Sequence, residues 1–228
     1  MSDLDRFLAN ARGPLAQSAK VVRLGELASA PLSPLSIDAW SFAAARGRFV
    51  ELSARGATAT LTAATELVVE AQLQGEPVAW LAPLSTTFYP PDVAASGVDL
   101  AALVVVRVAD AITAARSAER LLRSGAFGLV ILEVGDGELA MAVQGRLVTL
   151  AQTHDAAIVC LTEKSAETAS LGSLISLRTE ATRLRDEVVL RVIKDKRRGP
   201  GAMRTIKRGG PAGLGLDESA KIKLVTDE

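Results

Sequence analysis

Five short apolar runs alternate with longer stretches rich in Ala, Leu and Arg between residues 48 and 161. The runs have the length of strands, and the stretches between them are long enough for helices. Strands that are apolar throughout are typical of a parallel sheet covered by helices on both faces, with right-handed crossovers. We therefore predict an α/β fold with strands at Phe49–Leu52, Val78–Ala82, Leu103–Arg107, Leu129–Glu133 and Ala157–Leu161, and helices at Thr58–Gln74, Ala109–Ser124 and Glu138–Thr153.

The pattern changes after residue 170. Ser173–Thr179 and Glu187–Lys194 both have strand character, and only the link Glu180–Asp186 separates them. Because strands joined so closely run antiparallel, we expect a C-terminal antiparallel hairpin at one edge of the sheet. Three parts follow from this reading: an N-terminal helix and connector in 1–36, a core domain in 37–195, and a basic, Gly-rich flexible tail in 196–228.

The composition limits the classes of function. Lys plus Arg and Asp plus Glu both total 26, so no overall charge attracts the chain to nucleic acid or to a membrane. No apolar run approaches the roughly 20 residues that span a bilayer. One cysteine and one histidine do not suffice for a structural zinc site. Because the N-terminus has no signal-peptide pattern, we expect a cytoplasmic protein. We also expect that it needs no metal and no cofactor.

The N-terminal segment carries apolar residues at helical spacing, among them Leu4, Phe7 and Leu8. A stretch with two prolines separates this segment from the regular pattern. The apolar stripe therefore packs either on the core or on a neighbouring copy of the chain. Self-association through these three residues and packing on the core stay open as alternatives.

The loop after the first strand lies where a phosphate-binding loop would be expected. It reads Ser53-Ala54-Arg55-Gly56-Ala57-Thr58-Ala59, and the chain has no lysine between Lys20 and Lys164. A P-loop has the form G-x-x-x-x-G-K-[ST], in which backbone N–H groups surround the phosphates and the lysine binds the outer ones. The predicted strand, turn and helix are present here, but the lysine is missing.

Four segments carry a resemblance to a known family, in the same order along the chain. They are Gly47–Leu52, Ser96–Leu100, Leu122–Glu133, and Val188–Lys196 with its ending Val-Ile-Lys-Asp-Lys. Together they resemble the core of the RecA recombinases over about residues 37–200. There they correspond to the strand that enters the P-loop, the "GVD" segment, the strand with the Walker B carboxylate, and the closing strand. The resemblance implies a RecA-like central, mostly parallel sheet flanked by helices.

The positions that serve nucleotide chemistry in that family are degenerate in this chain. Glu133 occupies the Walker B position, while Leu84 stands where an acidic residue would activate water. Arg55 is either a replacement cation for phosphate or a solvated loop residue. The degenerate positions are Arg55, Gly56, Thr58, Thr60, Leu84 and Glu133. We expect no catalytic residue and no enzymatic activity, with a divergent RecA-type ATPase as one alternative.

A second set of segments narrows the resemblance. Trp80–Pro83, Tyr89–Pro91, Gly97–Leu100 and Glu119–Gly125 are similar to the ImuA family, the P-loop-less accessory proteins of translesion mutagenesis cassettes. The resemblance implies an adaptor induced by DNA damage in the SOS response. Its implied partners are an ImuB-like, Y-family-related protein, RecA, and an error-prone replicative-type polymerase. A SulA-like inhibitor of the tubulin-like division GTPase is the other alternative.

Basic residues gather near the predicted end of the core domain. We expect them either to keep a tail solvated or to bind an acidic partner or DNA phosphate weakly and without sequence specificity. The segment Thr162–Leu174, at the place of a DNA-binding loop in RecA proteins, is near neutral and has no aromatic residue, so it is not expected to bind single strands. The candidate docking residues are Lys194, Lys196, Arg197, Arg198, Arg204, Lys207 and Arg208.

Overall fold

A computed structural model describes residues 39–54, 59–184 and 187–207 of the chain. All of them belong to one compact unit. Within these residues, no helix has the combination of length and apolar character needed to cross a bilayer.

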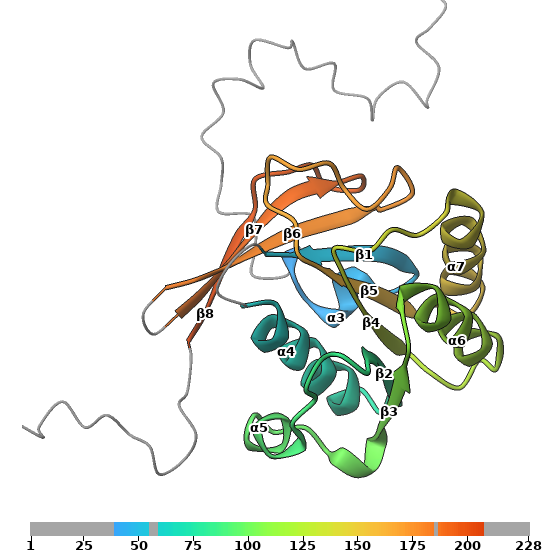
Figure 1. Ribbon diagram of the computed structural model, residues 1–228. Coiled ribbons are helices and arrows are strands. Elements are labelled where there is room, and N and C mark those ends of the chain that lie inside the picture. The colour runs from blue at the N-terminus through green and yellow to red at the C-terminus, as the bar shows by residue number, and fades with distance from the viewer. Residues whose placement is uncertain (1–38, 55–58, 185–186, 208–228) are drawn as a thin grey trace, which may run out of the picture. The chain divides into compact units, whose positions relative to one another are not determined.

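The unit is built on a sheet of eight strands in the order β3-β2-β4-β5-β1-β6-β7-β8 (Figure 1). Strands β1 to β6 are paired in parallel, and β7 and β8 continue the sheet as antiparallel strands. The strands are β1 (Arg48–Ser53), β2 (Val78–Pro83), β3 (Leu103–Val108), β4 (Leu129–Gly135), β5 (Ala157–Thr162), β6 (Leu177–Arg183), β7 (Glu187–Asp195) and β8 (Met203–Lys207).

Helices cover both faces of the sheet, as the apolar strands require. The helices are α3 (Phe42–Ala45), α4 (Thr60–Leu73), α5 (Pro90–Ala95), α6 (Ala111–Arg123) and α7 (Met141–Thr153), with a short 3₁₀ helix, η2 (Leu100–Ala102). α3 and α4 pack on one face, where the buried strand side chains include Val50, Trp80 and Ile131. α6 and α7 pack on the other face, against Leu132 and Cys160 among others (Figure 1).

The N-terminus of α6 is defined by its cap. The side chain of Asp110 accepts a hydrogen bond from the backbone N–H of Thr113 over 2.7 Å, and this bond lowers the pKa of Asp110. Arg120 and Arg123 lie in the last turn, where positive charge interacts favourably with the helix dipole. α6 therefore begins and ends close to the predicted limits.

The predicted fold class is confirmed: a mostly parallel sheet with helices on both faces and antiparallel strands at one edge. The predictions for the C-terminal third were less accurate. The first hairpin strand begins at Leu177, not Ser173, and extends through the predicted link to Arg183. Within the segment predicted as a flexible tail, Met203–Lys207 instead forms β8, which pairs with β7. The three-part division of the chain stays a prediction.

Candidate functional site

The candidate site lies at the carboxyl edge of the parallel strands, where open α/β sheets bind their ligands. β1 and β4 are separated by β5, and all three run in the same direction. Glu133 of β4 is level with Leu161 of β5 and Leu52 of β1. Thr60 begins α4 and is buried, and its N-cap residue, Ala59, makes no side-chain capping bond. The remaining loop positions, Arg55, Gly56 and Thr58, lie outside the described residues.

Both carboxylate oxygens of Glu133 are engaged by neutral donors. Trp80 Nε1 donates to Oε1 over 2.6 Å, and Thr86 Oγ1 donates to Oε2 over 2.8 Å. Thr86 is held in turn, since Arg107 Nη2 donates to its backbone oxygen over 2.5 Å. The Trp80 ring also packs edge-on against Phe88 at 5.6 Å between centroids. The segment between β2 and α5 therefore folds back onto the carboxylate of Glu133.

Leu84 lies in the same segment but takes no part in this arrangement. Its backbone N–H donates to the oxygen of Val108 over 2.7 Å, and its side chain is 66% exposed. An exposed leucine offers neither a proton acceptor nor a metal ligand at this edge. Of the six degenerate positions, three are described, and hydrogen bonds join only Glu133 to the surrounding loop.

A second carboxylate, which the sequence interpretation did not single out, is fully buried on β1. Glu51 accepts hydrogen bonds from Thr162 Oγ1 (3.0 Å), Ser170 Oγ (2.7 Å) and the backbone N–H of Leu171 (3.0 Å). Arg178 Nε lies 3.6 Å from Glu51 Oε2. The signal was present in the sequence as a single acidic residue inside an otherwise apolar strand.

Arg178 joins this carboxylate to the loop that follows β5. Its Nη1 donates to the oxygen of Thr168 over 2.6 Å, and its Nη2 donates to that of Ser165 over 2.8 Å. The segment at the place of the RecA DNA-binding loop is thus fastened to β1 and β6. An arginine with all of its polar ends used in this way is not presented to a ligand.

The basic residues near the C-terminus do not form one docking element. Arg204 of β8 lies 3.3 Å from Glu66 and 3.2 Å from Glu70 of α4, and it donates to the backbone oxygen of Trp40. Lys196 Nζ donates to the oxygen of Ser173 over 2.7 Å. The other described members are Lys194, whose pKa is lowered by burial and by the charge of Lys196, and the exposed residues Arg197, Arg198 and Lys207. Arg208 lies outside the described residues, as do Leu4, Phe7 and Leu8.

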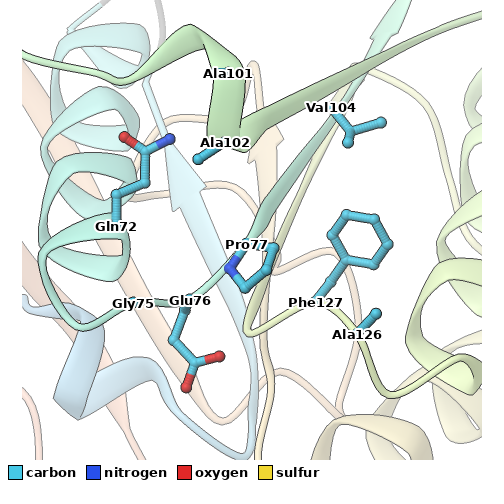
Figure 2. A pocket seen from close by; sticks show the side chains of 9 residues that line it. All are labelled: Gln72, Gly75, Glu76, Pro77, Ala101, Ala102, Val104, Ala126 and Phe127. Atoms are coloured by element: carbon cyan, nitrogen blue, oxygen red, sulfur yellow. The ribbon is translucent and has the colours of Figure 1, made fainter.

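A pocket of about 380 Å³ lies at the opposite, amino edge of the sheet (Figure 2). Apolar side chains such as Phe127 and Val104 form much of its lining. Its polar groups are already engaged: Gln72 exchanges two hydrogen bonds with the backbone of Asp99, and Glu76 pairs with Arg46 at 3.0 Å. Both polar side chains of the lining therefore take part in other interactions. Across the described residues, no group of three or more His, Cys, Asp or Glu side chains could hold a metal ion.

Comparisons with known proteins bear on the fold. No protein-family model matches the chain, and no curated protein matches it significantly. Among solved structures, the chain is similar to a crystal structure of the RadB recombinase, with a TM-score of 0.56 and 16% sequence identity over 72% of this chain and 88% of that one. At this identity the likeness shows the RecA-like fold of the chain.

Proposed function

We propose that this protein is a non-catalytic RecA-like adaptor of DNA-damage-induced translesion synthesis, of the ImuA kind. In this role it binds RecA, an ImuB-like protein related to the Y family, or both. It links them to an error-prone replicative-type polymerase. The proposal combines the RecA-like fold with the loss of the residues that would bind and hydrolyse ATP. Its support is the site itself and the ordered ImuA-like segments Trp80–Pro83, Tyr89–Pro91 and Gly97–Leu100.

The observation that carries the proposal is the engagement of Glu133. In a working site this carboxylate is linked to magnesium, and a lysine stabilises the phosphates. Here Trp80 and Thr86 occupy both of its oxygens, and hydrogen bonds to a charged group contribute about 1.5–3 kcal/mol each. Each oxygen keeps a second lone pair, so these bonds lower the capacity of Glu133 to help bind a metal without removing it. With no lysine between Lys20 and Lys164, the phosphate charge would also lack its usual counter-charge.

Nucleotide turnover is the direct test of the non-catalytic part. The purified full chain should neither bind ATP with magnesium nor hydrolyse it, and Glu133→Gln and Arg55→Ala should behave like the unchanged protein. Magnesium-dependent turnover that Glu133→Gln abolishes would refute the proposal. Loss of turnover in Arg55→Ala alone would instead establish the divergent ATPase.

Co-purification tests the adaptor part. Tagged full-length protein, isolated after DNA damage, should retain the ImuB-like protein or RecA. Retention of the tubulin-like division GTPase in their place would overturn the adaptor role in favour of a SulA-like inhibitor. Exposed Leu84 and Tyr89, in the segment that folds onto Glu133, are 66% and 57% exposed and offer an apolar contact for a partner. Leu84→Asp combined with Tyr89→Ser should therefore weaken retention, whereas Leu73→Asp, at an 82% exposed position at the end of α4, is the matched control.

A further inference from the structure

The helical layer formed by α6 and α7 carries a surplus of positive charge. Its two helices hold four arginines and one glutamate. The helices on the opposite face, α3, α4 and α5, hold three acidic residues and no basic one. A chain of zero formal net charge therefore has one distinctly basic helical layer. We call the surface of Arg116, Arg120, Arg123 and Arg146 the arginine face.

The spacing of these arginines places three of them in one stripe. Arg116, Arg120 and Arg123 stand at i, i+4 and i+7 of α6, and all three are exposed. Between the first and the last, α6 rises by about 10 Å. Measured along the axis of a DNA duplex, that distance corresponds to about three base-pair steps of about 3.4 Å each. Arg146 is contributed by α7, which lies beside α6 (Figure 1).

Glu119 orients two of the guanidinium groups. Its Oε1 lies 2.6 Å from Arg123 Nη2, and its Oε2 lies 3.1 Å from Arg146 Nε. The Glu119 side chain is only 17% exposed, whereas those of Arg123 and Arg146 are 66% and 50% exposed. The carboxylate thus lies beneath the two arginines and leaves most of their N–H donors facing outward.

The other two arginines of the face have no such partner. In the described part of the chain, neither a salt bridge nor a hydrogen bond engages the guanidinium of Arg116 or Arg120. Acidic residues border the face toward the N-terminal ends of the helices, at Asp110, Asp136 and Glu138. At the other end, Asp155 follows α7 and pairs with Arg46. The centre of the face is therefore cationic and open.

The chemistry of the face favours a phosphate backbone over a protein. Protein interfaces have an apolar centre, whereas the large exposed apolar residues of these helices, Ile112 and Met141, stand in their first turns. Single-stranded nucleic acid requires aromatic rings for stacking, and α6 and α7 contain none. A second copy of the chain would have to offer the acidic α4, but Glu66 and Glu70 already pair with Arg204.

We propose that the arginine face binds the phosphate backbone of duplex DNA without reading its sequence. Guanidinium groups match phosphate oxygens in a bidentate geometry, and each neutralised phosphate releases counterions. The binding is therefore strongly salt-dependent. The choice of DNA over RNA rests on the proposed function; the choice of a duplex phosphate backbone rests on the face alone.

The test measures binding of the full chain to a fluorescent DNA duplex at several salt concentrations. Arg116→Ala with Arg120→Ala should reduce the magnitude of the slope of log K against log salt by about 1.8, because each phosphate contributes about 0.9. The affinity ratio between about 50 and about 200 mM salt should then shrink about twelvefold. Arg116→Lys with Arg120→Lys keeps both charges and should keep the slope. Arg183→Ala with Arg191→Ala removes two exposed charges elsewhere and should leave the slope unchanged.

Several outcomes would overturn the inference. The first is no duplex binding by the unchanged protein, and the second is an equal loss in the Arg183/Arg191 control. The others are tighter binding to an RNA duplex of the same length, and Arg116- and Arg120-dependent binding of polyglutamate without binding of DNA. Co-purification of the partner proteins, measured on the same variants, separates the two proposals. If the partners are retained while no DNA binds, only the DNA inference fails.

Discussion

Arg48 and Asp195, which are 147 positions apart in the chain, form a buried ion pair with 2.7 Å between Arg48 Nη2 and Asp195 Oδ1. Their side chains are 2% and 4% exposed. Arg48 also donates to the backbone oxygens of Ser176 and Ala44, and Asp195 accepts from the backbone N–H of Arg197. The pair thereby joins the start of β1 to the end of β7 and ties the antiparallel edge to the parallel sheet.

The first prediction concerns the removal of one member of this pair. Asp195→Ala leaves the guanidinium of Arg48 buried without its counter-charge, which should lower the free energy of unfolding by about 3–5 kcal/mol. Chemical denaturation measures the change. The control is Arg191→Ala, since Arg191 pairs with Glu180 but is 52% exposed, and exposed pairs contribute about 0–1 kcal/mol. Equal losses in the two variants would contradict the prediction. The double variant Arg48→Met with Asp195→Leu removes both charges and should recover much of the loss.

The second prediction is the pH dependence of the same pair. Burial raises the pKa of Asp195, but the hydrogen bonds from Arg48 and Arg197 and the charge of Arg48 together lower it below its ordinary value. The folded state therefore favours the ionised carboxyl, whose unfolded pKa is about 3.9. The stability that this gives is complete well above that pKa and is lost as pH falls through the lower, folded pKa.

Asp195→Asn isolates this effect, because it keeps the shape of the side chain and removes the charge. The stability difference between the unchanged protein and Asp195→Asn should be large at neutral pH and should shrink as the pH falls below about 4. Thermal or urea denaturation from neutral to acidic pH measures it. A difference that stays constant over this range would show that the charge of Asp195 does not contribute.

The parts of the fold that the sequence predicted are those in which local pattern and burial agree. The apolar run Leu129–Glu133 and the capped helix after Asp110 are both set by local signals, and both occur near their predicted limits. β8 was missed because Met-Arg-Thr-Ile-Lys follows Gly and Pro and is partly charged. Its strand is stabilised by contacts distant in sequence, the pairing with β7 and the ion pairs of Arg204 with α4.

At the site, too, the position of a residue follows from local pattern, whereas its partners depend on contacts distant in sequence. Glu133 could be placed at the carboxyl edge from the order of the segments alone. Its hydrogen bonds to Trp80 and Thr86, 53 and 47 residues away, could not be predicted, because they depend on how the segment after β2 folds back. The Glu51–Arg178 pair was missed for a related reason: neither residue has a charged neighbour in sequence that would indicate an ion pair across two strands.

The third prediction concerns Arg204, which compensates two carboxylates on α4. Burial raises the pKa of Glu66, the charge of Arg204 lowers it, and the charge of Glu70 raises it, with a net shift upward. Arg204→Met should therefore destabilise the fold by about 1–3 kcal/mol at neutral pH, because a partly buried carboxylate then loses its counter-charge. Glu66→Gln in the same chain should restore part of this loss, as the repulsion from Glu70 disappears. Denaturation of the single and double variants measures the coupling.

The stability contributed by Glu66 depends on pH with the opposite sign to that contributed by Asp195. A carboxyl whose folded pKa is raised binds a proton more readily in the folded state, so its contribution to stability increases as pH falls through the folded pKa. The penalty of Arg204→Met should thus be largest at neutral pH and should decrease as the pH falls toward the raised pKa of Glu66. A penalty that stays constant on acidification would show that Arg204 acts through its backbone contact to Trp40 rather than through Glu66.

The fourth prediction is that Arg178 keeps the loop after β5 closed. Its bonds to Ser165 and Thr168 hold a segment in which Glu163 and Glu167 are exposed. Because Arg178→Met alone would leave Glu51 buried without a counter-charge, the change is combined with Glu51→Gln. Loss of two hydrogen bonds, at about 1 kcal/mol each, should make opening of the loop at least about tenfold more frequent.

A glutamate-specific protease should then cleave after Glu163 and Glu167 at least that much faster, at a concentration where local opening limits cleavage. Arg183→Met, on the same strand but exposed and outside this network, should leave the cleavage rate unchanged. If the double variant is cleaved at the rate of the unchanged protein, Arg178 does not keep the loop closed, and the remaining bonds of Glu180 to Ala166 and of Gln144 to Leu171 suffice.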